Sequence, residues 1–579
     1  MGVRSDTSRV AMGPYLRSAV PFLLLLVCWC CLEGLTAGEI VGRVVDAQTG
    51  NLLSARVYVE SEAGEPYTVK SLAEGGTALV YDKRRGASQE VHTTLSAHPF
   101  TVTVPEGPYR IIAERGKEYR TATRDLRVSD GRIEVTLVLE RWVNMAELGW
   151  YSGDTHVHRR LEELPNLVMA EDLNVALPLT YWVTEFDETP VRNSGSRIKE
   201  LPKSPASLIE VDPFHVIWPI NTEYEIFTVG GKNHTLGAVF VLNHQTPLDL
   251  PAQPVAVVAK EARHQDALLD LDKHNWPWSM MLMPLMEVDL YELTNNHLWR
   301  TDFLYSTWYP EYLPRYLGLK RPQDSFSEMT WIQWGFSNYY ALLNCGFDIM
   351  PSAGNASGVH PVPLGFGRVY VHLGANFDFQ DWMNGLEKGR SFVTTGPMLD
   401  VRFNGHLPGA RFASDPGADP TISIEGGARW DQDIDRVEII VNGDVVETIV
   451  PASAPGVKSD LSFVANIELR GTSWLAVRCF GTSQDDRPRF AHSGPVHVVI
   501  PGQPLQPKKD EIDYLIGRVN DEIERSRDIL PQYALDEYGK ALRFYQSKLP
   551  GVGRGQSPGK MTRPQRSAYF NETLGATND

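Results

Sequence analysis

The pattern of apolar and polar residues changes character several times along the chain, and each change marks a predicted domain boundary. From residue 39 to about residue 141 the two kinds alternate in short runs, as expected of half-buried strands. The predicted strands are Glu39–Asp46, Ser54–Glu60, Phe100–Val104, Tyr109–Arg115 and Ile133–Leu139. Gly and Pro turn signals separate them, so residues 39–141 are predicted to form a β-sandwich.

Residues 143–397 instead alternate strand-like runs with helical ones. The predicted strands are Val175–Leu179, Glu225–Val229, Leu236–Asn243, Met280–Pro284, Asp289–Leu293 and Arg368–Leu373. The predicted helices are Val255–Leu271 and Thr330–Cys345. This alternation predicts a parallel α/β arrangement, with a barrel as one form of it and with site residues at strand ends.

Beyond residue 397 the pattern is again all-β and then helical. Strands are predicted at Met398–Phe403, Thr421–Glu425, Val437–Val441, Leu461–Leu469 and Ser473–Cys479. Asn404-Gly405 and Asn442-Gly443 are typical of hairpin turns, so residues 398–501 are predicted to form a second, smaller β-sandwich. Residues 508–550 are predicted to be helical, docking on the body of the protein or on a partner subunit. Residues 551–579 are predicted to be disordered.

The first 37 residues have the features of a signal peptide. Three arginines precede an apolar run, Ala19–Leu32, that is too short to favour a membrane span. Small residues then offer a cleavage point near Ala37–Gly38. The protein is therefore predicted to be exported, to the periplasm or the extracellular space, with no stable membrane span after processing. An uncleaved signal anchor is the alternative.

Cysteine usage and net charge exclude several classes of protein. Three of the five cysteines lie in the leader, which leaves Cys345 and Cys479 and no disulfide framework. The formal charge of -17 over 579 residues argues against a nucleic-acid partner. Neither a G-x-G-x-x-G nor a Walker loop is present, so a nucleotide cofactor is not expected. The oligomeric state stays open.

Candidate chemistry concentrates in residues 143–397, which hold ten of the fifteen histidines and ten of the fourteen tryptophans. The stretch Gly153–His158 reads GDTHVH. Residues two apart on a strand point to the same side, so His156 and His158 can chelate one divalent metal, with Asp154 on the same side. A pair of partly exposed surface histidines is the alternative.

The middle region resembles the PHP (polymerase and histidinol phosphatase) superfamily, in its carbaryl-hydrolase-like metallohydrolase branch. The resemblance rests on GDTHVHRR, TEYEIFTVGGKNHTLGAVFV, DLDKHNWPW, LLNCGFDIMPSAGNASGVHPVPLGFGRVYVH and GRSFVTTGPMLDVRFNGHLPG. Residues 39–141, through GRVVDAQTGNLLSARVYV and VTVPEGPYRIIAERG, resemble a carboxypeptidase-regulatory-like sandwich. The resemblance implies a multidomain protein of class α/β plus all-β, with a central distorted β/α barrel flanked by two β-sandwiches and a C-terminal helical tail.

The same resemblance implies a set of metal ligands. His156 and His158 match the ligands of the first strand, and either Glu223 or Glu225 matches a bridging carboxylate. The weaker matches are His234 and His274, and His360, two residues beyond the segment 354–358, is a candidate substitute for a ligand missing there. Expected acidic and histidine ligands are missing at residues 180–182, which read TYW, and at residues 354–358, which read GNASG. We therefore expect one divalent ion (Zn, Mn or Fe) rather than a cluster.

Each candidate also has a structural interpretation. Glu223 and Glu225 suit solvated strand carboxylates, and His274, among tryptophans, suits a packed core residue. The polar cluster that contains Glu292, Asn295, Asn296 and His297 either lines the pocket or caps a turn. Arg368 either neutralises an anionic substrate or forms a buried ion pair.

Two functions remain. The first is an exported metal-dependent hydrolase in which a metal lowers the pKa of a water that attacks an ester, amide-like or phosphoester bond. His156 and His158 would be catalytic ligands, Asp154 would bind or orient, and the substrate would be a small or envelope-derived molecule. The second is a catalytically silent binding or scaffold protein of the cell envelope, which the missing ligands favour.

Overall fold

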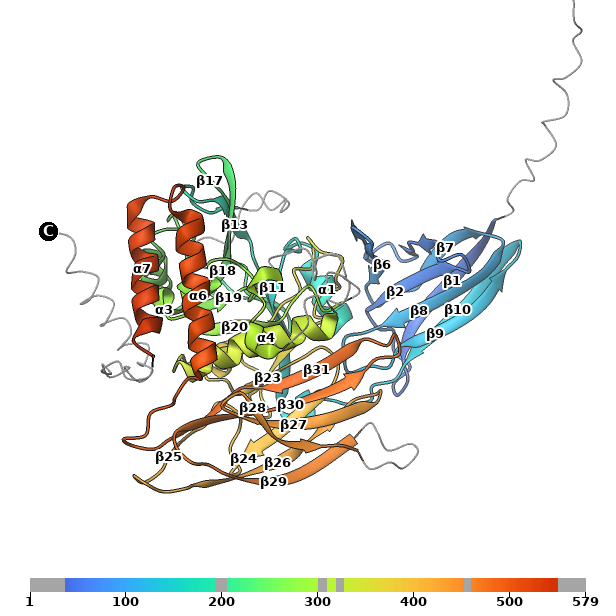
Figure 1. Cartoon of the computed structure of the whole chain (residues 1–579). Helices are drawn as coiled ribbons and strands as arrows, with labels where there is room; N and C mark the ends of the chain where they lie inside the picture. The colour runs from blue at the N-terminus through green and yellow to red at the C-terminus, as the bar shows by residue number, and fades with distance from the viewer. Residues whose placement is uncertain (1–36, 193–205, 300–309, 319–326, 452–459, 550–579) are drawn as a thin grey trace, which may run out of the picture.

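The computed structural model of the chain describes residues 37–192, 206–299, 310–318, 327–451 and 460–549. They form an N-terminal β-sandwich, a middle region, a C-terminal β-sandwich and two final helices (Figure 1). Residues 1–36 of the predicted leader and the predicted disordered tail lie outside the described residues. Within the described part of the chain, every helix is too short or too polar to cross a bilayer.

The N-terminal sandwich packs two sheets around one apolar core. One sheet contains β1 (Ala37–Asp46), β4 (Lys70–Ser71), β7 (Phe100–Pro105) and β10 (Gly131–Leu139). The other contains β2 (Ala55–Ser61), β3 (Pro66–Tyr67), β5 (Ala78–Arg85), β6 (Ser88–Leu95), β8 (Gly107–Glu114) and β9 (Ala122–Val128). Side chains at alternate positions, such as Ile40, Val57 and Ile111, fill the space between the sheets, as strand periodicity requires. All five predicted strands of this region form.

The middle region contains parts of two sheets. The first includes β15 (Ile209–Asp212), β16 (His215–Ile217), β12 (Val175–Pro178), β11 (Trp150–Val157), β22 (Arg368–His372) and β23 (Ser391–Thr394). The second contains β14 (Val191–Arg192), β13 (Tyr181–Glu185), β17 (Thr222–Val229), β18 (Lys232–Leu242), β19 (Leu268–Leu271), β20 (Leu290–Thr294) and β21 (Met350–Ala353). The α-helices are α1 (Leu164–Glu171), α2 (Val255–His264), α3 (Ser279–Met286), α4 (Glu328–Asn344) and α5 (Phe379–Glu387), with 3-10 turns at Ala146–Leu148, Pro310–Tyr312 and Arg315–Leu317.

The strand order corrects the parallel α/β prediction. Both sheets are mixed: β11 pairs parallel with β12 but antiparallel with β22, and β18 pairs antiparallel with both β17 and β19. Over the described residues, no strand pairing joins the two sheets into a closed barrel. The middle region is therefore a mixed α/β body built on two mixed sheets.

Two predicted elements of the middle region are wrong. The predicted helix Val255–Leu271 ends at His264, and Leu268–Leu271 forms β19. The predicted strand Met280–Pro284 instead lies inside α3. Short apolar runs that are buried on all sides carry no periodicity that separates a strand from a helix. Tertiary packing therefore decided the secondary structure of both segments.

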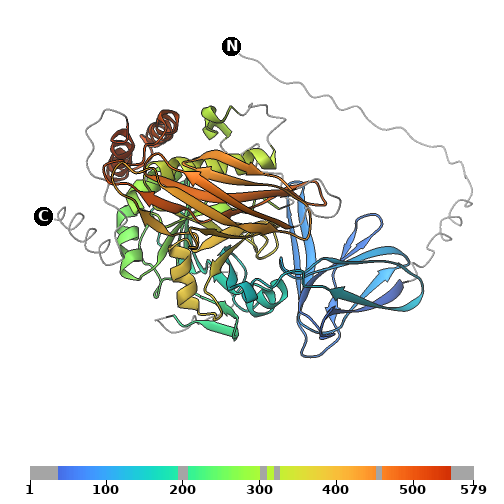
Figure 2. The ribbon, with the colours of Figure 1, turned by 90° about the horizontal axis from the view of Figure 1, so that it is seen from below.

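The C-terminal sandwich shares a sheet with the middle region. The strands β25 (Arg411–Ala413), β27 (Ile434–Val441), β28 (Asp444–Ile449), β30 (Ser473–Thr482), β31 (Pro488–Ser493) and β32 (Val496–Val499) form its first layer. The second layer contains β24 (Met398–Phe403), β26 (Thr421–Arg429) and β29 (Asp460–Glu468). Because β31 pairs with β23, the sheet of β11 runs directly into the sandwich. Figure 2 shows these strands lying across the middle region.

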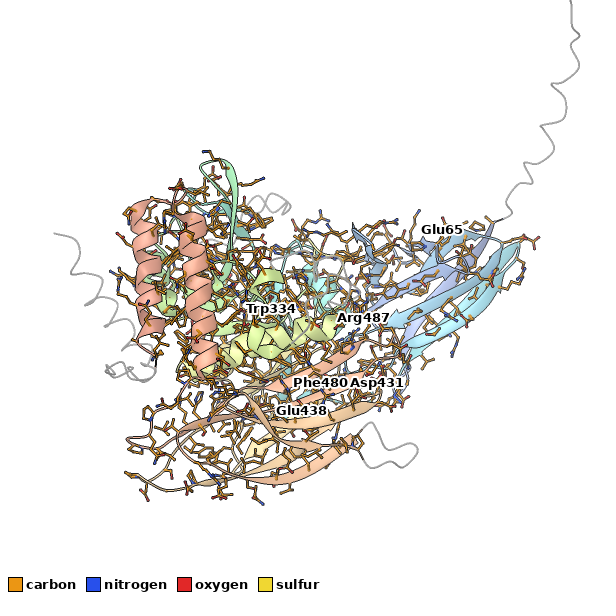
Figure 3. The ribbon with its side chains drawn as sticks, viewed as in Figure 1. Glu65, Trp334, Asp431, Glu438, Phe480 and Arg487 are labelled. Atoms are coloured by element: carbon orange, nitrogen blue, oxygen red, sulfur yellow. The ribbon has the colours of Figure 1, made fainter. Side chains whose placement is uncertain are left out.

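The predicted turn at Asn442-Gly443 forms between β27 and β28. Both residues have positive φ, 51° and 88°, as a two-residue hairpin of the expected type requires. Asn344 of α4 donates its side-chain amide to the carbonyl of Asn442 at 3.1 Å, so the turn also contacts the middle region. Figure 3 shows Trp334 of α4 and, nearer the N-terminal sandwich, Arg487, whose Nε donates to Glu328 at 2.8 Å.

The predicted helical segment forms α6 (Lys509–Ser526) and α7 (Gln532–Gln546), with the break at Pro531. Both helices pack on the middle region (Figure 1). Tyr545 donates its hydroxyl to the carbonyl of Met280 in α3 at 2.8 Å, and Ser526 contacts His234 Nε2 at 2.9 Å. Docking on the body of the protein is therefore the arrangement adopted.

Ion pairs join the N-terminal sandwich to the middle region. Asp172, which follows α1, accepts from Arg115 and from Arg141 at 2.7 Å each. Arg56 of β2 pairs with Glu171 at the end of α1. Burial opposes ionisation of Asp172, but Arg115, His215 and Arg141 outweigh it and hold the pKa of Asp172 well below its usual range. These charges hold one face of the sandwich against α1.

We predict that Asp172→Asn destabilises the protein by about 2–3 kcal/mol, because the buried Arg115 loses its carboxylate and the partly exposed Arg141 keeps only Glu118. The lowered pKa means that the contribution of Asp172 is present above its unfolded pKa, about 3.9, and is lost as pH falls toward the folded value. Urea unfolding at pH 7 and at several values below pH 4 measures both effects, and the difference between the proteins should shrink in acid.

Asp125→Asn is the matched control, because Asp125 pairs with Arg110 on the open surface with a side chain that is 66% exposed. We expect its unfolding curve to match that of the unaltered protein. Equal curves for Asp172→Asn would contradict the stabilising role of these interdomain ion pairs.

Candidate metal centre

The candidate site lies where the end of β11 meets β17 and β20. His156 and His158 approach each other with their Nε2 atoms 3.2 Å apart. His158 Nε2 also lies 3.2 Å from Glu223 Oε2, and His156 Nδ1 lies 2.7 Å from Glu292 Oε1. Glu223 belongs to β17 and Glu292 to β20. The second sheet thus brings two carboxylates to the histidine pair of the first.

Local packing forces these groups together. Every residue of β11 is buried, and His156 is only 2% exposed. A Cβ atom on Gly354 would lie 2.1 Å from His156 Cβ and 2.3 Å from Glu292 Oε1. Glycine at 354 is therefore required for the close approach of the histidine strand to the carboxylate.

Asp272, just after β19, completes a second group of donor atoms. Its Oδ1 lies 3.9 Å from His156 Nδ1. The two groups share one histidine: His156, His158 and Glu223 form one, and His156, Asp272 and Glu292 form the other. Within each group the ligand atoms lie within 4.8 Å of one another.

Lys273 distinguishes the two groups. Its Nζ contacts both carboxylate oxygens of Asp272, at 2.6 and 2.7 Å. Burial opposes ionisation of Asp272, but the nearby Lys273 ammonium outweighs it and lowers the pKa of that carboxyl. Asp272 therefore already has a cation, whereas the structure describes no such contact for Glu223.

The other acids crowd together. Burial raises the pKa of Glu223 and of Glu292 well above the usual range, and the charge of Asp272 raises both further. The pKa of Glu225 is raised in the same way by burial and by Glu223. Carboxyl groups that are buried close together are stabilised by a nearby positive charge, so such a cluster is typical of a cation-binding site.

The histidine rings are suited to bind that cation. Burial lowers the pKa of His156 well below its usual range and that of His158 to about 4, so both rings are neutral at pH 7. His158 Nδ1 and Glu223 Oε2 are buried and make no hydrogen bond to a described residue. Neutral imidazole and carboxylate donors fit Zn, Mn or Fe. The residues present therefore fit a divalent ion.

Asp154 has a different position from the one its spacing predicts. Its carboxylate accepts from Asn355 Nδ2 at 2.6 Å, from the Gly365 amide at 3.0 Å and from the His156 amide at 3.1 Å. Burial raises its pKa to about 7 in spite of these hydrogen bonds. Asp154 ties β11 to the loop over residues 355–367 and so orients the backbone of His156.

Three of the predicted histidine ligands, His234, His274 and His360, lie outside both groups. His234 in β18 contacts Ser526 Oγ at 2.9 Å and Arg525 at 3.2 Å, on the side that faces α6. His274 is 1% exposed and lies against Trp331 and Trp334, with ring centroids 4.4 and 4.8 Å away. The aromatic contacts of His274 match the packed-core interpretation.

Glu225, His360 and Arg368 lie around the groups rather than in them. The charge of Glu225 acts on His158, and the His360 ring contacts Arg85 at 3.2 Å. Arg368 is 1% exposed, and its guanidinium donates to the carbonyls of Gly365, Asp172 and Glu171. Arg368 therefore neither faces the groups nor forms an ion pair with a described carboxylate.

The two departures from the family pattern have structural consequences. Trp182 stands where a ligand was expected, and its ring centroid lies 5.5 Å from that of His158. Asn355, in the segment 354–358, donates its side-chain amide to Asp154 and to the Gly367 carbonyl, and its Oδ1 accepts from the Gly367 amide. Both positions support the histidine pair without offering it an acidic or imidazole ligand.

Sequence reasoning missed Asp272 and Lys273, and identified Glu292 only as part of a polar cluster. The available signal was the alternation of Asp270 and Asp272 at the end of a strand. Prediction of a helix through residue 271 hid it. His297, from the same polar cluster as Glu292, is fully buried and lies against Trp331 with centroids 4.3 Å apart.

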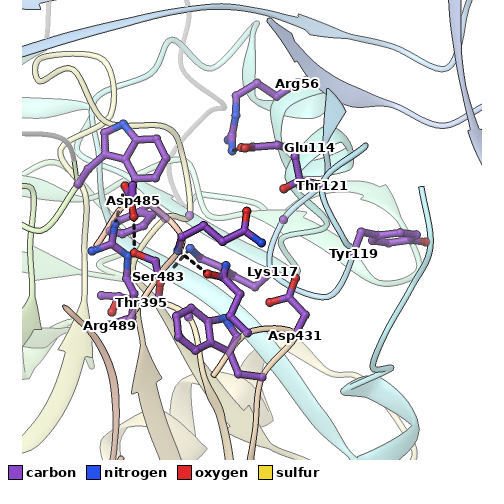
Figure 4. Close-up of a pocket in the computed structure, with 18 of the residues that line it drawn as sticks. Arg56, Glu114, Lys117, Tyr119, Thr121, Thr395, Asp431, Ser483, Asp485 and Arg489 are labelled. Carbon is purple, nitrogen blue, oxygen red and sulfur yellow. Dashed lines mark hydrogen bonds and ion pairs between the residues drawn. The ribbon is translucent and has the colours of Figure 1, made fainter. Parts of the chain in front are cut away.

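A cavity of about 410 Å³ lies elsewhere, where both sandwiches meet the middle region (Figure 4). Lys117 Nζ there donates to the Thr395 carbonyl at 3.0 Å and lies 4.0 Å from the centre of the Phe366 ring. Burial, with Arg368 and Arg489, lowers the pKa of Lys117 well below its usual range. The residues of the two donor groups do not line this cavity, so it is a separate feature.

No protein-family model and no curated protein matches the chain. Among solved structures, it is similar to a two-domain protein from Bacteroides vulgatus that contains a predicted PHP-like metal-dependent phosphoesterase. The identity is 10% over 57% of this chain and 90% of that chain, with a TM-score of 0.28.

The other similar structures cover the chain more narrowly. Fibronectin(III)-like modules of Clostridium thermocellum CbhA are 18% identical over 17% of this chain and 98% of that chain, with a TM-score of 0.12. A DUF3823 family protein from Parabacteroides merdae is 14% identical over 18% of this chain, with a TM-score of 0.13. The chain spans about half the length of that protein, 47%. Likenesses this slight do not place the chain in a family.

Proposed function

We propose that the protein is an exported metal-dependent hydrolase of the PHP type that cleaves an ester, amide-like or phosphoester bond. The observation that carries the proposal is the convergence of His156 Nε2, His158 Nε2 and a Glu223 oxygen, buried together within 4.8 Å. The sequence resemblance to the carbaryl-hydrolase-like branch, with its distorted β/α barrel and its carboxypeptidase-regulatory-like sandwich, is a second support.

One ion suits the site better than several. His156 has its Nδ1 2.7 Å from Glu292 Oε1, the arrangement in which a metal-binding histidine donates its other N–H to a carboxylate. That leaves His156 Nε2, His158 and Glu223 to hold the ion and assigns Glu292 to orient the ring. A bound Zn, Mn or Fe ion would supply a Lewis acid and lower the pKa of a water for hydrolysis.

Other side chains of this chain prepare the site. Lys273 balances the charge of Asp272, so that a single divalent ion has fewer carboxylates to neutralise. Phe240 and Trp182 cover the histidine pair, with centroids 4.4 Å from His156 and 5.5 Å from His158. Apolar walls exclude bulk water and strengthen the electrostatic interactions inside.

A catalytically silent scaffold of the cell envelope is the second candidate. The observation in its favour is the loss of the expected acidic and histidine ligands at residues 180–182 and at residues 354–358, where Trp182 and Ala356 offer neither a carboxylate nor an imidazole. In either case the proposed partners are small or envelope-derived molecules rather than nucleic acid.

We predict that the purified protein holds about one equivalent of a divalent metal, and that His156→Ala and Glu223→Gln each lose most of it. Each change removes one of three ligands. Glu292→Gln should keep the site and weaken affinity by about 10- to 100-fold, because it removes only the orienting carboxylate. Metal content by mass spectrometry after dialysis against graded chelator measures both effects.

His234→Ala is the control for this series, since it removes a histidine that the structure places against α6. Its metal content should equal that of the unaltered protein. Equal metal content in His156→Ala and the unaltered protein would rule out the proposed centre.

We further predict hydrolysis of a generic aryl ester or aryl phosphate that a chelator abolishes and that added Zn or Mn restores. The assay is release of 4-nitrophenol by metal-loaded and metal-stripped protein, with His156→Ala alongside. A protein that binds its metal but releases no 4-nitrophenol from either substrate would favour the scaffold.

A further inference from the structure

The cavity of about 410 Å³ lies where both sandwiches meet the middle region. Its walls come from β8 and the loop before β9, from Gly365, Phe366 and Arg368 of the middle region, and from the β26–β27 and β30–β31 turns of the C-terminal sandwich. A cavity of this size at a domain interface is typical of a small-molecule site. The charges on its walls indicate which molecules fit.

Lys117, in the loop between β8 and β9, brings to this cavity a cation without a carboxylate partner (Figure 4). In the part of the chain that the structure describes, its Nζ donates to the Thr395 carbonyl and lies against the Phe366 ring, but no acid pairs with it. An ammonium has three N–H donors, so Lys117 keeps donors for a ligand.

The surroundings of Lys117 are positive on balance. Burial and then the charges of Arg368 and Arg489, which also line the cavity, lower the pKa of Lys117 well below its usual range. Arg489 donates to Glu328 at 3.3 Å, and Arg368 donates to three backbone carbonyls. The two arginines therefore act on the cavity through their charge, and an anion beside Lys117 would stabilise its ammonium.

Asp431 brings a carboxylate to the same cavity from the C-terminal sandwich (Figure 4). Burial raises its pKa, and the charges of Arg120 and Lys117 act in the opposite direction. Among the described residues, no ion pair includes Asp431. Because a carboxylate accepts and an ammonium donates, a ligand that contacts both must offer a donor to Asp431 and an anionic acceptor to Lys117.

Neutral polar side chains cover other parts of the wall. They belong to Thr121, Thr123, Gln432 and Gln484. Hydroxyl and amide groups both donate and accept, so they match the hydroxyl groups of a ligand. An inorganic anion has no donor for Asp431, and a simple amino acid leaves the neutral side chains without partners. A carboxylate that carries several hydroxyl groups meets all of these requirements.

We propose that this cavity binds a sugar acid, a small molecule with one carboxylate and several hydroxyl groups. The carboxylate accepts from Lys117, and the hydroxyl groups donate to Asp431 and form hydrogen bonds with the neutral side chains. Both sandwiches supply ligand contacts, so the site requires the whole chain. The proposal is independent of the hydrolase function, because the residues of the two donor groups do not line this cavity.

The test is isothermal titration calorimetry of the full chain with D-glucuronate and D-galacturonate. D-glucose lacks the carboxylate, acetate lacks the hydroxyl groups, and L-alanine is a zwitterion, so these three are titrated as comparisons. The variants are Lys117→Gln and Asp431→Ala. Lys70→Gln is the matched control, because Lys70 is exposed on β4 of the same sandwich and does not line the cavity. Each titration is repeated after treatment with a chelator, because a uronate also binds metal ions.

The unaltered protein and Lys70→Gln should bind at least one uronate with equal affinity, more tightly than the three comparison molecules and equally well after chelator treatment. Lys117→Gln should weaken this binding by about 10- to 100-fold, the loss of one charge-assisted hydrogen bond. Asp431→Ala should reduce the preference for the uronate over acetate by about 10-fold, because the ligand hydroxyl groups lose a charged acceptor.

Unfolding curves by circular dichroism accompany each variant, and Asp431→Ala carries the test if Lys117→Gln does not fold. Four results would overturn the inference. They are no binding of either uronate, equal affinity in Lys117→Gln and Lys70→Gln, an unchanged preference over acetate in folded Asp431→Ala, and tighter binding of alanine than of both uronates. Loss of uronate binding after chelator treatment would also overturn it, because the ligand would then be held by a metal ion.

Discussion

Acidic side chains that are buried together repel one another and lack the solvation of water, so a fold tolerates them only with compensating positive charge. This constraint applies to Glu223, Asp272 and Glu292, which lie near the end of β11. Asp272 satisfies it through Lys273, and Glu292 approaches His156. Among the described residues, no lysine or arginine contacts Glu223. The rest of the site is arranged around that unbalanced carboxylate, and neutral imidazoles beside it make a divalent ion the natural partner.

The surrounding structure holds this arrangement in place at a distance. Asp154 uses its whole carboxylate on backbone and amide donors, so the strand carrying His156 cannot shift without breaking three hydrogen bonds. Gly354 permits the close approach that a side chain would prevent. The sheet that contains β11 continues through β23 into the C-terminal sandwich. A rigid sheet on one side and a tethered loop on the other give the metal ligands a fixed geometry, as binding sites require.

The N-terminal sandwich has two kinds of contact with the middle region, and they differ in consequence. Ion pairs of Arg115 and Arg141 with Asp172 hold the bodies together. The β5–β6 hairpin then brings Tyr81 and Arg85 to the loop beside His158. The hairpin therefore reaches the loop whose Ser357 carbonyl accepts from the His158 amide.

Local pattern was enough to predict much of the framework. Five strands in each sandwich, helix α4, the hairpin at Asn442-Gly443 and the break at Pro531 follow from periodicity and turn chemistry, which depend on neighbouring residues. The pairing of His156 with His158 was likewise predictable, because strand alternation places residues two apart on one side. Buried apolar runs such as Leu268–Leu271 and Met280–Pro284 were not, since they lack a polar face to set their period.

The sequence by itself determined the predicted strands of the two sandwiches and the histidine pair, because both follow from alternation over a few consecutive residues. Only the tertiary structure decided which acids join that pair, placing Glu223, Asp272 and Glu292 near it while His234 faces α6. It also brought Tyr81, more than seventy residues earlier in the chain, to the loop beside His158 through hydrogen bonds with Gly358 and His360. Such contacts depend on how sheets and domains pack over long separations in sequence, and no local pattern records them.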